Sequence, residues 1–440
     1  MAALATGAGR AGVAIVRVSG PRAGDALDAL TAKPRPTPFR ASPRAFRNAQ
    51  THEPIDFGIA LWMPGPRNFT GDDIAEFHVH GGAAIVAALV DALIALGYVR
   101  LAEPGEFTRR AFENGKLDLT QAEAIADLVD AETEGQRKQA LRQFEGALEK
   151  RIEAWRARLI HIMALCEAEI DFPDEDLPDH LARTARPEIA SLASDFEAFL
   201  ADAHRGERVR EGFRVAIIGA PNAGKSSLLN ALVAREAAIV SDIPGTTRDI
   251  VEARIVLAGF PVWIADTAGL REAADAIEAE GVRRALERAR DADLRIGVND
   301  SRETQSLDAL RPGDILAFSK SDLARPSENA IRTAHARELE THLVSVRTGE
   351  GVDALRARLA EIVSAMLGAE EAAPITRARH RELIEGARAA LRRANANLER
   401  GAELAAEDLR LAARRLGRIT GRVDVEDILG EIFARFCIGK

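Results

Sequence analysis

The spacing of apolar and polar residues changes character along the chain. Up to about residue 118, short alternating apolar runs such as 13–18 and 74–79 are separated by Pro- and Gly-rich breaks, which indicates an α+β unit. Thr120 and Glu123 then fit a capping box, and a helical stripe of apolar residues continues in pieces to about residue 210. A small α+β domain followed by helices is therefore expected.

From residue 213 onward, the pattern is typical of an α/β sheet. Apolar strands are expected at 214–218, 262–265, 294–298 and 315–318, with helices between them. The chain is helical again from residue 377 to its end. We therefore predict a multidomain protein with an N-terminal α+β domain over residues 1–118, an all-α helical domain in two halves at 119–210 and 372–440, and an α/β domain inserted between these halves at 211–371.

The composition narrows the class of protein. Of the 440 residues, 47% are apolar and 29% are charged, as in globular proteins, and no apolar run approaches the roughly 20 residues that cross a bilayer. No basic leader precedes a long apolar stretch near residue 1, so we expect a cytoplasmic protein without membrane insertion. A net charge of -9 argues against coating nucleic acid by bulk attraction, so any RNA contact should be local or shared with a partner.

The two cysteines are too few for a disulfide framework or a metal site. Cys166 shares a helical face with Trp155, Leu159 and Ile162, which predicts a core position. Cys437 is either a reactive thiol or a small hydrophobic side chain near a pocket.

A phosphate-binding loop follows the first predicted strand of the α/β part. The segment Gly219-Ala-Pro-Asn-Ala-Gly224-Lys225-Ser226 fits the P-loop pattern, with an apolar strand before it and a helix after it. Glycines let backbone N–H groups turn toward phosphates, Lys225 supplies a charge to the β and γ oxygens, and the Ser226 hydroxyl can reach Mg²⁺. The inserted domain is therefore predicted to be a P-loop domain.

Two further segments specify the nucleotide. Asp266-Thr-Ala-Gly269 follows another strand, where the carboxylate can hold the metal through water and the Gly269 amide can face the γ-phosphate. Ser319-Lys320-Ser321-Asp322 resembles the Asn-Lys-x-Asp element of GTPases, in which the Asp accepts from guanine. Ser319 replaces the supporting Asn, so weaker guanine affinity is expected. The turn at 345–347 resembles the last guanine element.

Two long stretches extend the resemblance beyond the P-loop. Residues 69–82 (Phe69-Thr-Gly-Asp-Asp-Ile-Ala-Glu76-Phe-His78-Val-His80-Gly-Gly) and 103–123 (Glu103-Pro-Gly-Glu-Phe-Thr-Arg-Arg to Gln-Ala-Glu123) combine with the terminal Phe436-Cys437-Ile-Gly-Lys440. With them, the chain resembles the MnmE (TrmE) family of tRNA modification GTPases from end to end. The resemblance assigns nucleotide contacts to Asn222, Ala223, Gly224, Lys225, Ser226, Ser227, Ser241, Asp242, Ile243, Pro244, Gly245, Thr246, Thr247, Asp266, Thr267, Ala268, Gly269, Ser319, Lys320, Asp322, Ser345, Val346 and Arg347.

The resemblance also implies how water is activated. Leu270 stands where many GTPases carry a water-orienting Gln, and Asn222 together with the loop 244–249 resembles potassium-activated GTPases. By this resemblance K⁺ would be bound by Asn222, Ser241, Ile243 and Thr246, and Mg²⁺ by Ser226 and Thr247. Catalysis would rest on Lys225 and on Glu278, which alternatively is only a solvated helix charge. Arg248 is either a direct finger or, with Asp249, a group that orders its loop or contacts the opposing G domain when two of them meet.

The N-terminal domain carries a second candidate site. Glu76, His78 and His80 alternate onto one strand face, which leaves zinc as an alternative to an ordinary exposed face. The resemblance implies instead a one-carbon tetrahydrofolate, 5-formyl- or methylene-substituted, bound by Arg17, Glu76, Lys116 and Lys440. A carboxylate suits the pterin donors and cations suit the glutamate tail.

The implied activity is GTP hydrolysis coupled to modification of the tRNA wobble uridine. The family resemblance implies a homodimer that forms a heterotetramer with an FAD-dependent partner and installs a 5-carboxymethylaminomethyl or aminomethyl-type group. Arginines of the last helices, such as Arg388 and Arg414, form either a phosphate-binding face or ordinary solvated charge. Two other functions stay open: a ribosome-assembly or RNA-chaperone GTPase, and a folate-binding module with a degenerate G domain.

Overall fold

The computed structural model describes residues 1–172, 178, 180–234, 252–266, 291–302, 308–368, 375–423, 426–434, 436, 437 and 439. The chain divides into two compact units. The first unit contains Met1–Val129, Gln143–Phe196 and Leu383–Lys440, and the second contains Asp130–Arg142 and Glu197–Glu382. No helix among the described residues is long and apolar enough to span a membrane.

The first unit begins with an antiparallel sheet in the order β1-β2-β5-β4-β3. Its strands are β1 (Ala2–Leu4), β2 (Ala11–Ser19), β3 (Ser42–Arg47), β4 (Pro54–Met63) and β5 (Ile74–Gly81). The alternation predicted for β2 and β5 is confirmed: Val16, Val18, Phe77 and Val79 are buried in the core that includes α1 (Ala23–Thr31) and α2 (Ala83–Ile94). The intervening residues face away from this core.

The helical part starts with α3 (Glu106–Glu113) and α4 (Leu119–Asp130). The capping box predicted at Thr120 and Glu123 is wrong, because it lies two residues earlier. Asp118 Oδ1 accepts from the backbone N–H groups of Thr120, at 2.5 Å, and Gln121, at 3.0 Å, while Gln121 Oε1 accepts from Asp118 N–H at 3.0 Å. Aspartate and glutamine thus replace the serine-type and glutamate partners, and the helix begins at Leu119.

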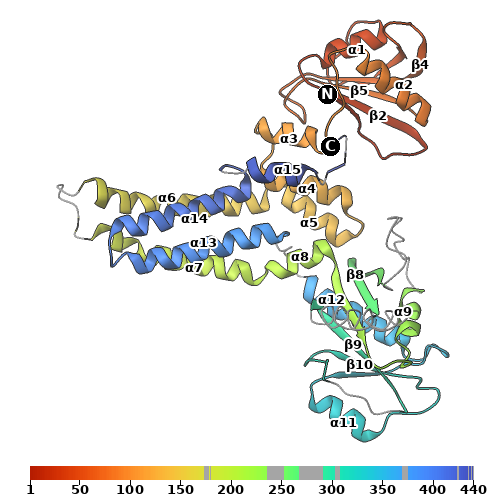
Figure 1. The fold of residues 1–440 in the computed structure, drawn as a ribbon, viewed down its shortest axis with the longest axis vertical. Coiled ribbons are helices and arrows are strands. Elements are labelled where there is room, and N and C mark those ends of the chain that lie inside the picture. Colours follow the sequence, from red (N-terminus) through yellow and green to blue (C-terminus); the bar gives the residue numbers. More distant parts are fainter. Residues whose placement is uncertain are drawn as a thin grey trace, which may run out of the picture. The chain divides into compact units, whose positions relative to one another are not determined.

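The helical elements that follow are α5 (Glu134–Phe144), α6 (Ala147–Asp171), the 3₁₀ turn η1 (Leu181–Ala185), α7 (Arg186–Ala201), α13 (Ala378–Asn397), α14 (Ala402–Thr420) and α15 (Glu426–Ala434). Within the first unit, α6 and α14 run side by side (Figure 1). Trp155, Leu159, Ile162 and Cys166 are buried on one face of α6, which confirms the core position predicted for Cys166. Burial raises the pKa of the Cys166 thiol to about 11.

The second unit holds a six-stranded sheet in the order β11-β10-β9-β6-β8-β7. Its strands are β6 (Phe213–Ile218), β7 (Glu252–Leu257), β8 (Phe260–Asp266), β9 (Leu294–Asp300), β10 (Ile315–Ser319) and β11 (Glu340–Leu343). All neighbours are parallel except β7 and β8. Helices α8 (Ala203–Glu211), α9 (Lys225–Val233), α11 (Glu328–Ala336) and α12 (Val352–Leu367) belong to the same unit. The four predicted strands are confirmed, as is the multidomain fold class.

Candidate nucleotide and folate sites

The phosphate loop joins β6 to α9 at the carboxyl edge of the parallel sheet. Gly219 adopts φ +154°, and a Cβ there would lie 2.3 Å from the Val298 carbonyl oxygen, so the chain can turn here only with glycine. Gly224 adopts φ +98° and caps the N-terminus of α9. Asn222 and Ala223 lie between these glycines, and Ser226 and Ser227 lie in the first turn of α9. The loop therefore presents a helix N-terminus, where backbone N–H groups favour phosphate.

Lys225 is held by the loop that it follows. Its side chain is buried, and Nζ donates to the carbonyl oxygens of Gly219, at 2.9 Å, and Ala220, at 2.6 Å. Main-chain carbonyls are neutral acceptors, whereas phosphate oxygens are charged and form stronger hydrogen bonds with an ammonium group. The loop therefore keeps a positive charge beside the place where phosphates would lie.

Ser226 and Asp266 meet at the same edge. Asp266 ends β8, is 2% exposed, and accepts a short hydrogen bond from the Ser226 hydroxyl. A hydroxyl and a carboxylate oxygen in contact are the hard oxygen donors that Mg²⁺ prefers. This donor set fits the metal predicted from the sequence.

The base-reading segment lies directly against the phosphate loop. Lys320, at φ +54°, donates from Nζ to the Asn222 carbonyl oxygen and to Asp300 Oδ2, both at 2.8 Å. The Ser319 hydroxyl donates to the Ala223 carbonyl oxygen at 2.5 Å. Two consecutive residues of one segment thus bond to two consecutive residues of the other.

Asp300 is a residue that the sequence reasoning missed. It ends β9, pairs in register with Ser319, and its side chain is 3% exposed. A hydrogen bond from Arg302 at 2.7 Å, together with the one from Lys320, lowers the pKa of the Asp300 carboxyl despite its burial. The available signal was a carboxylate at the end of the strand predicted at 294–298.

Asp322 is fixed by the last predicted guanine element. The fully buried Ser345 donates from its hydroxyl to Asp322 Oδ1 at 2.7 Å, and Arg347 lies 3.9 Å from Oδ2. Val346 and Arg347 are exposed, at 40% and 81% respectively, the latter measured on the side chain. The structure therefore brings together Asp322 and the 345–347 turn, although Ser345 follows Asp322 by 23 positions in the sequence.

Part of the predicted site lies outside the described residues. These positions are Ser241, Asp242, Ile243, Pro244, Gly245, Thr246, Thr247, Arg248, Asp249, Thr267, Ala268, Gly269, Leu270, Glu278 and Lys440. The potassium loop and the water-orienting glutamate therefore stay predictions.

In the N-terminal domain, Arg17 and Glu76 face one another across β2 and β5. Arg17 Nε donates to Glu76 Oε1 at 2.9 Å, and His78 Nε2 lies 3.1 Å from Glu76 Oε2. The Glu76 side chain is 9% exposed. A nearly buried carboxylate flanked by a guanidinium and an imidazole fits a ligand that carries both hydrogen-bond donors and an anion.

The zinc alternative does not match the geometry. His80 turns to Asp56, with 2.9 Å between Nδ1 and Oδ1, whereas His78 bonds Glu76. Across the described parts of the chain, no group of three or more His, Cys, Asp or Glu side chains could hold a metal ion.

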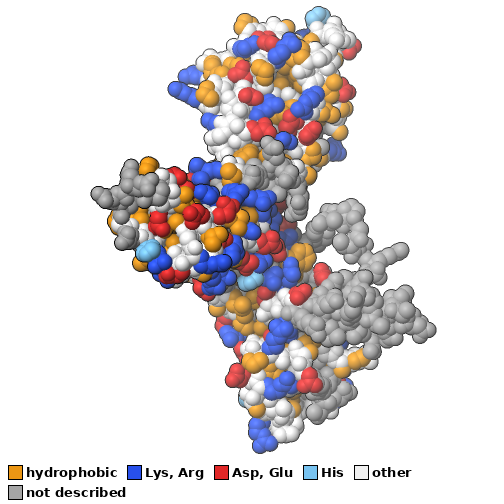
Figure 2. Space-filling model, turned by 60° about the vertical axis from the view of Figure 1, so that its left-hand side comes forward, with side chains coloured by type: hydrophobic (Ala, Val, Ile, Leu, Met, Phe, Trp, Pro, Cys, Tyr) orange, Lys and Arg blue, Asp and Glu red, His pale blue; other side chains and the backbone are white. Residues whose placement is uncertain are grey.

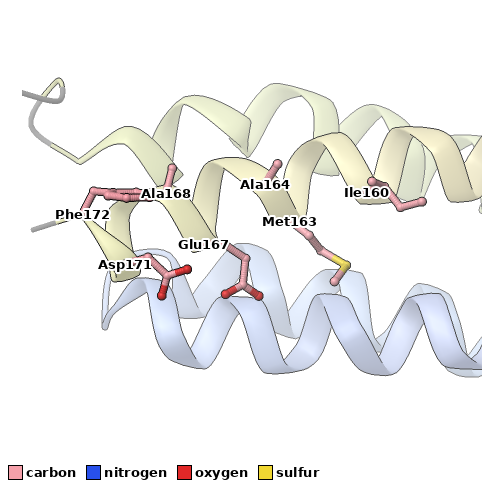
Figure 3. A pocket seen from close by; sticks show the side chains of 7 residues that line it. All are labelled: Ile160, Met163, Ala164, Glu167, Ala168, Asp171 and Phe172. Atoms are coloured by element: carbon pink, nitrogen blue, oxygen red, sulfur yellow. The ribbon is translucent and has the colours of Figure 1, made fainter.

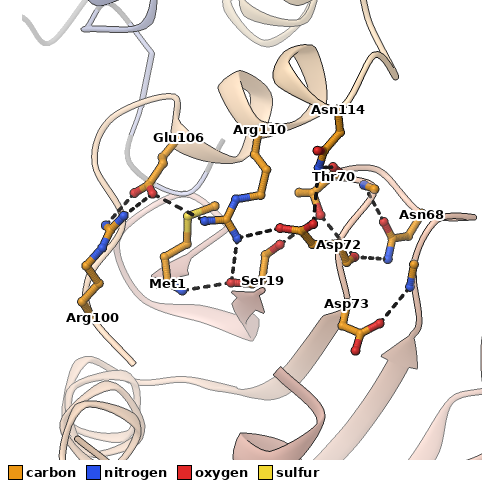
Figure 4. Close-up of polar contacts among 12 residues, drawn as sticks. Met1, Ser19, Asn68, Thr70, Asp72, Asp73, Arg100, Glu106, Arg110 and Asn114 are labelled. Atoms are coloured by element: carbon orange, nitrogen blue, oxygen red, sulfur yellow. Dashed lines mark hydrogen bonds and ion pairs between the residues drawn. The ribbon is translucent and has the colours of Figure 1, made fainter. Parts of the chain in front are cut away.

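A polar network attaches the α3 segment to the sheet (Figure 4). Arg110 donates to the Ser19 carbonyl oxygen at 3.0 Å and pairs with Asp72 at 3.2 Å, while Asn114 donates to the Thr70 carbonyl oxygen at 2.7 Å. Lys116 follows and donates to the Pro66 carbonyl oxygen at 2.8 Å. The network therefore fixes the segment that carries the predicted folate-binding lysine.

The C-terminal segment lies against the same domain. A Cβ at Gly439 would lie 2.0 Å from the Leu4 carbonyl oxygen, and Gly105 N–H donates to the Cys437 carbonyl oxygen at 3.4 Å. Leu4 belongs to β1, whose Ala3 pairs in register with Arg17. Gly439 thus packs against β1, the strand next to the one that carries Arg17, although the two residues are far apart in sequence.

Two surface features carry no part of these sites. A groove of about 430 Å³ along α6 is lined by Ile160, Met163, Ala164, Glu167, Ala168, Asp171 and Phe172 (Figure 3). Over the helices, Lys and Arg side chains are interspersed with Asp and Glu (Figure 2). Arg393 pairs with Asp408 and Arg414 with Glu407, which favours solvated ion pairs over a phosphate-binding face at these two positions.

Comparison with known proteins covers the whole chain. Two family models match, the MnmE helical domain over residues 119–437 and the GTP-binding protein TrmE N-terminus over residues 1–116. Three similar relatives are named tRNA modification GTPase MnmE. They come from Parvibaculum lavamentivorans (55% identity, 100% of this chain and 99% of the relative), Maricaulis maris (54%, 100% and 99%) and Phenylobacterium zucineum (56%, 99% and 98%).

Proposed function

The chain belongs to the MnmE family of tRNA modification GTPases, and from that premise we propose that it acts on the wobble uridine of tRNA. It is a GTP hydrolase. In the proposed reaction it works in the cytoplasm with an FAD-dependent partner, as a heterotetramer, and installs a 5-carboxymethylaminomethyl or aminomethyl-type group. We assign folate binding to residues 1–118, GTP hydrolysis to 211–371, and the connecting scaffold to 119–210 with 372–440.

The observation that supports GTP as the substrate is the meeting of phosphate and base elements at one sheet edge. Asp322, oriented by the Ser345 hydroxyl, would accept hydrogen bonds from guanine N1 and its exocyclic amine. Lys225 would exchange its two carbonyl acceptors for β and γ oxygens. Ser226 and Thr247 would hold Mg²⁺, with Asp266 reaching it through water. When bound, the metal offsets the charge on the β and γ oxygens.

Hydrolysis requires a group that orients the attacking water, and the apolar Leu270 cannot do so. We assign this role to Glu278. Asn222, Ser241, Ile243 and Thr246 would hold K⁺, whose charge would act in place of an arginine finger worth roughly 10³–10⁵ in rate. Because the Asn222 carbonyl oxygen accepts from Lys320, we assign its side-chain oxygen to the cation.

The N-terminal domain would hold the one-carbon tetrahydrofolate through Arg17, Glu76, Lys116 and Lys440. Glu76 would accept from the pterin ring and the cations would face the glutamate tail. On β4, Phe57 and Ile59 alternate with the core residues Ala60 and Trp62, and they are 65% and 41% exposed. Such exposed apolar side chains on one face support homodimer formation through this domain.

The test is GTP hydrolysis by the purified chain in matched potassium and sodium buffers. A potassium preference of at least about tenfold would support the cation site, since Na⁺ carries the same charge and only a set of ligands spaced for the larger ion would distinguish the two. Equal rates in both buffers would contradict it. If the chain hydrolyses GTP and deletion of its gene abolishes the wobble modification, the protein is not merely a ribosome-assembly GTPase. Absence of GTP hydrolysis would favour a folate-binding module with a degenerate G domain.

A further inference from the structure

The structure shows an unusual contact where the sequence departs from the GTPase element. Ser319, in place of Asn, is 8% exposed and closes β10. Its Oγ lies 2.5 Å from the Ala223 carbonyl oxygen and 3.1 Å from the Asn299 carbonyl oxygen. Both partners are acceptors, so the hydroxyl must donate its single proton, and the shorter distance points to the phosphate loop.

We propose that Ser319 is a positioning residue that couples the phosphate loop to the guanine-reading segment, so that its hydroxyl replaces the missing amide and guanine affinity is retained. This inference rests on the proposed binding of a guanine nucleotide. It replaces the expectation, drawn from the sequence alone, that Ser319 weakens the site.

The close packing explains why a small donor suits this position. A Cβ at Gly224 would lie 3.7 Å from Ser319 Cβ, which places the serine directly beside the glycine that caps α9. At this separation the short hydroxyl already reaches the loop carbonyl at 2.5 Å. The chain therefore forms the link by close approach of backbone segments and does not need a longer side chain.

Lys320, the next residue, provides a second hydrogen bond from the guanine-reading segment to the phosphate loop. Lys320 Nζ donates to the Asn222 carbonyl oxygen and is held by Asp300, whose carboxylate also pairs with Arg302. Asp300 and Ser319 are register partners on the neighbouring strands β9 and β10, so the ion pair of Asp300 and the hydrogen bond of Ser319 lie side by side at the ends of these strands. Asp300 therefore holds Lys320 against the phosphate loop, and the two links fix Asp322 relative to Lys225.

The test is binding of fluorescent GDP together with steady-state GTP hydrolysis. Ser319→Ala should raise the Kd for GDP and the KM for GTP about tenfold with kcat unchanged, because the hydroxyl positions the binding segments without touching the reacting atoms. Ser319→Thr keeps the donor and should restore both values to within about twofold of the wild type. Ser327→Ala is the matched control, since Ser327 Oγ accepts from Ala330 N–H at the start of α11, away from the phosphate loop.

The outcomes separate the inference from the proposed function. A wild type that binds GDP normally, with Ser319→Ala unchanged, would overturn the coupling role alone. A loss in Ser319→Ala that Ser319→Thr does not restore, or that Ser327→Ala reproduces, would also overturn it. Absence of GDP binding by the wild type would overturn the proposed nucleotide site and the inference together.

Discussion

The nucleotide site and the proposed folate site are assembled in opposite ways. The nucleotide site takes short contiguous segments from the ends of parallel strands β6, β8 and β10, which meet at one edge. The folate site takes single residues from antiparallel strands, with Arg17 and Glu76 separated by 59 positions, and adds the α3 segment and the chain terminus. Chemistry is therefore visible in sequence motifs at the first site and scattered at the second.

The two sites also differ in the hydrogen-bond partners of their cationic side chains. Lys225 donates to neutral main-chain carbonyls, whereas Arg17 pairs with the Glu76 carboxylate. A phosphate can replace carbonyl acceptors with a gain in charge attraction, but a ligand at Arg17 must accommodate an existing ion pair. The nucleotide site should therefore depend on its cation strongly, and the folate site should depend on the pair as a unit.

The largest effect is expected at Lys225. Lys225→Ala removes the only charge that the phosphate loop itself supplies, so GTP hydrolysis should fall at least about 100-fold. Hydrolysis measured by phosphate release checks this, with Lys150→Ala as the control because Lys150 lies on α6 in the first unit and donates to the Glu145 carbonyl oxygen. Unchanged turnover of Lys225→Ala would contradict the assigned loop.

A second large effect is expected at Glu278. Glu278→Ala should slow hydrolysis about 100-fold while GDP affinity stays near that of the wild type, because a water-orienting group acts in the chemical step. Single-turnover hydrolysis and GDP titration separate the two. Equal losses of binding and hydrolysis would show that Glu278 supports the fold or the nucleotide and not the water.

The sequence predicted more at the nucleotide site than elsewhere, for physical reasons. Strands β6, β8, β9 and β10 are apolar runs buried between helices, so their pattern identified them, and their ends located Lys225, Asp266 and Asp322. Edge strand β11, with the residues Glu340 to Leu343, is polar and only half-buried, so no alternation revealed it. Asp300 was missed because only the strand register places it beside Ser319.

At the N-terminal site the sequence indicated the strands but not the partners. The period of two in β5 placed Glu76, His78 and His80 on one face, which is why zinc was an alternative. The structure does not support zinc, because these side chains have partners on the neighbouring strands: Arg17 on β2 bonds Glu76, and Asp56 on β4 bonds His80. Such cross-strand partners depend on tertiary register, which a single sequence does not specify.

An intermediate effect is expected at Glu76. Glu76→Gln keeps the shape and one oxygen acceptor but removes the charge that pairs with Arg17, so the Kd for tetrahydrofolate should rise about tenfold. GTP hydrolysis should not change. Calorimetric titration with tetrahydrofolate measures the effect, and His80→Gln is the control because the His80 side chain is 69% exposed and bonds Asp56. An equal loss in both variants would contradict the role of Glu76.

The smallest effect is expected at the thiols. Cys437 is exposed, whereas burial raises the pKa of Cys166 to about 11, so at pH 8 only on the order of 10⁻³ of Cys166 is thiolate. A thiol reagent should therefore react rapidly with only one cysteine. The Cys437→Ser variant should lack this rapid reaction, which identifies the reactive residue as Cys437. Because the terminal segment packs on β1 beside the Arg17 strand, tetrahydrofolate should slow this reaction about threefold. Rapid reaction of both cysteines would contradict the burial of Cys166. If tetrahydrofolate did not slow the reaction of Cys437, the C-terminal segment would lie away from the folate.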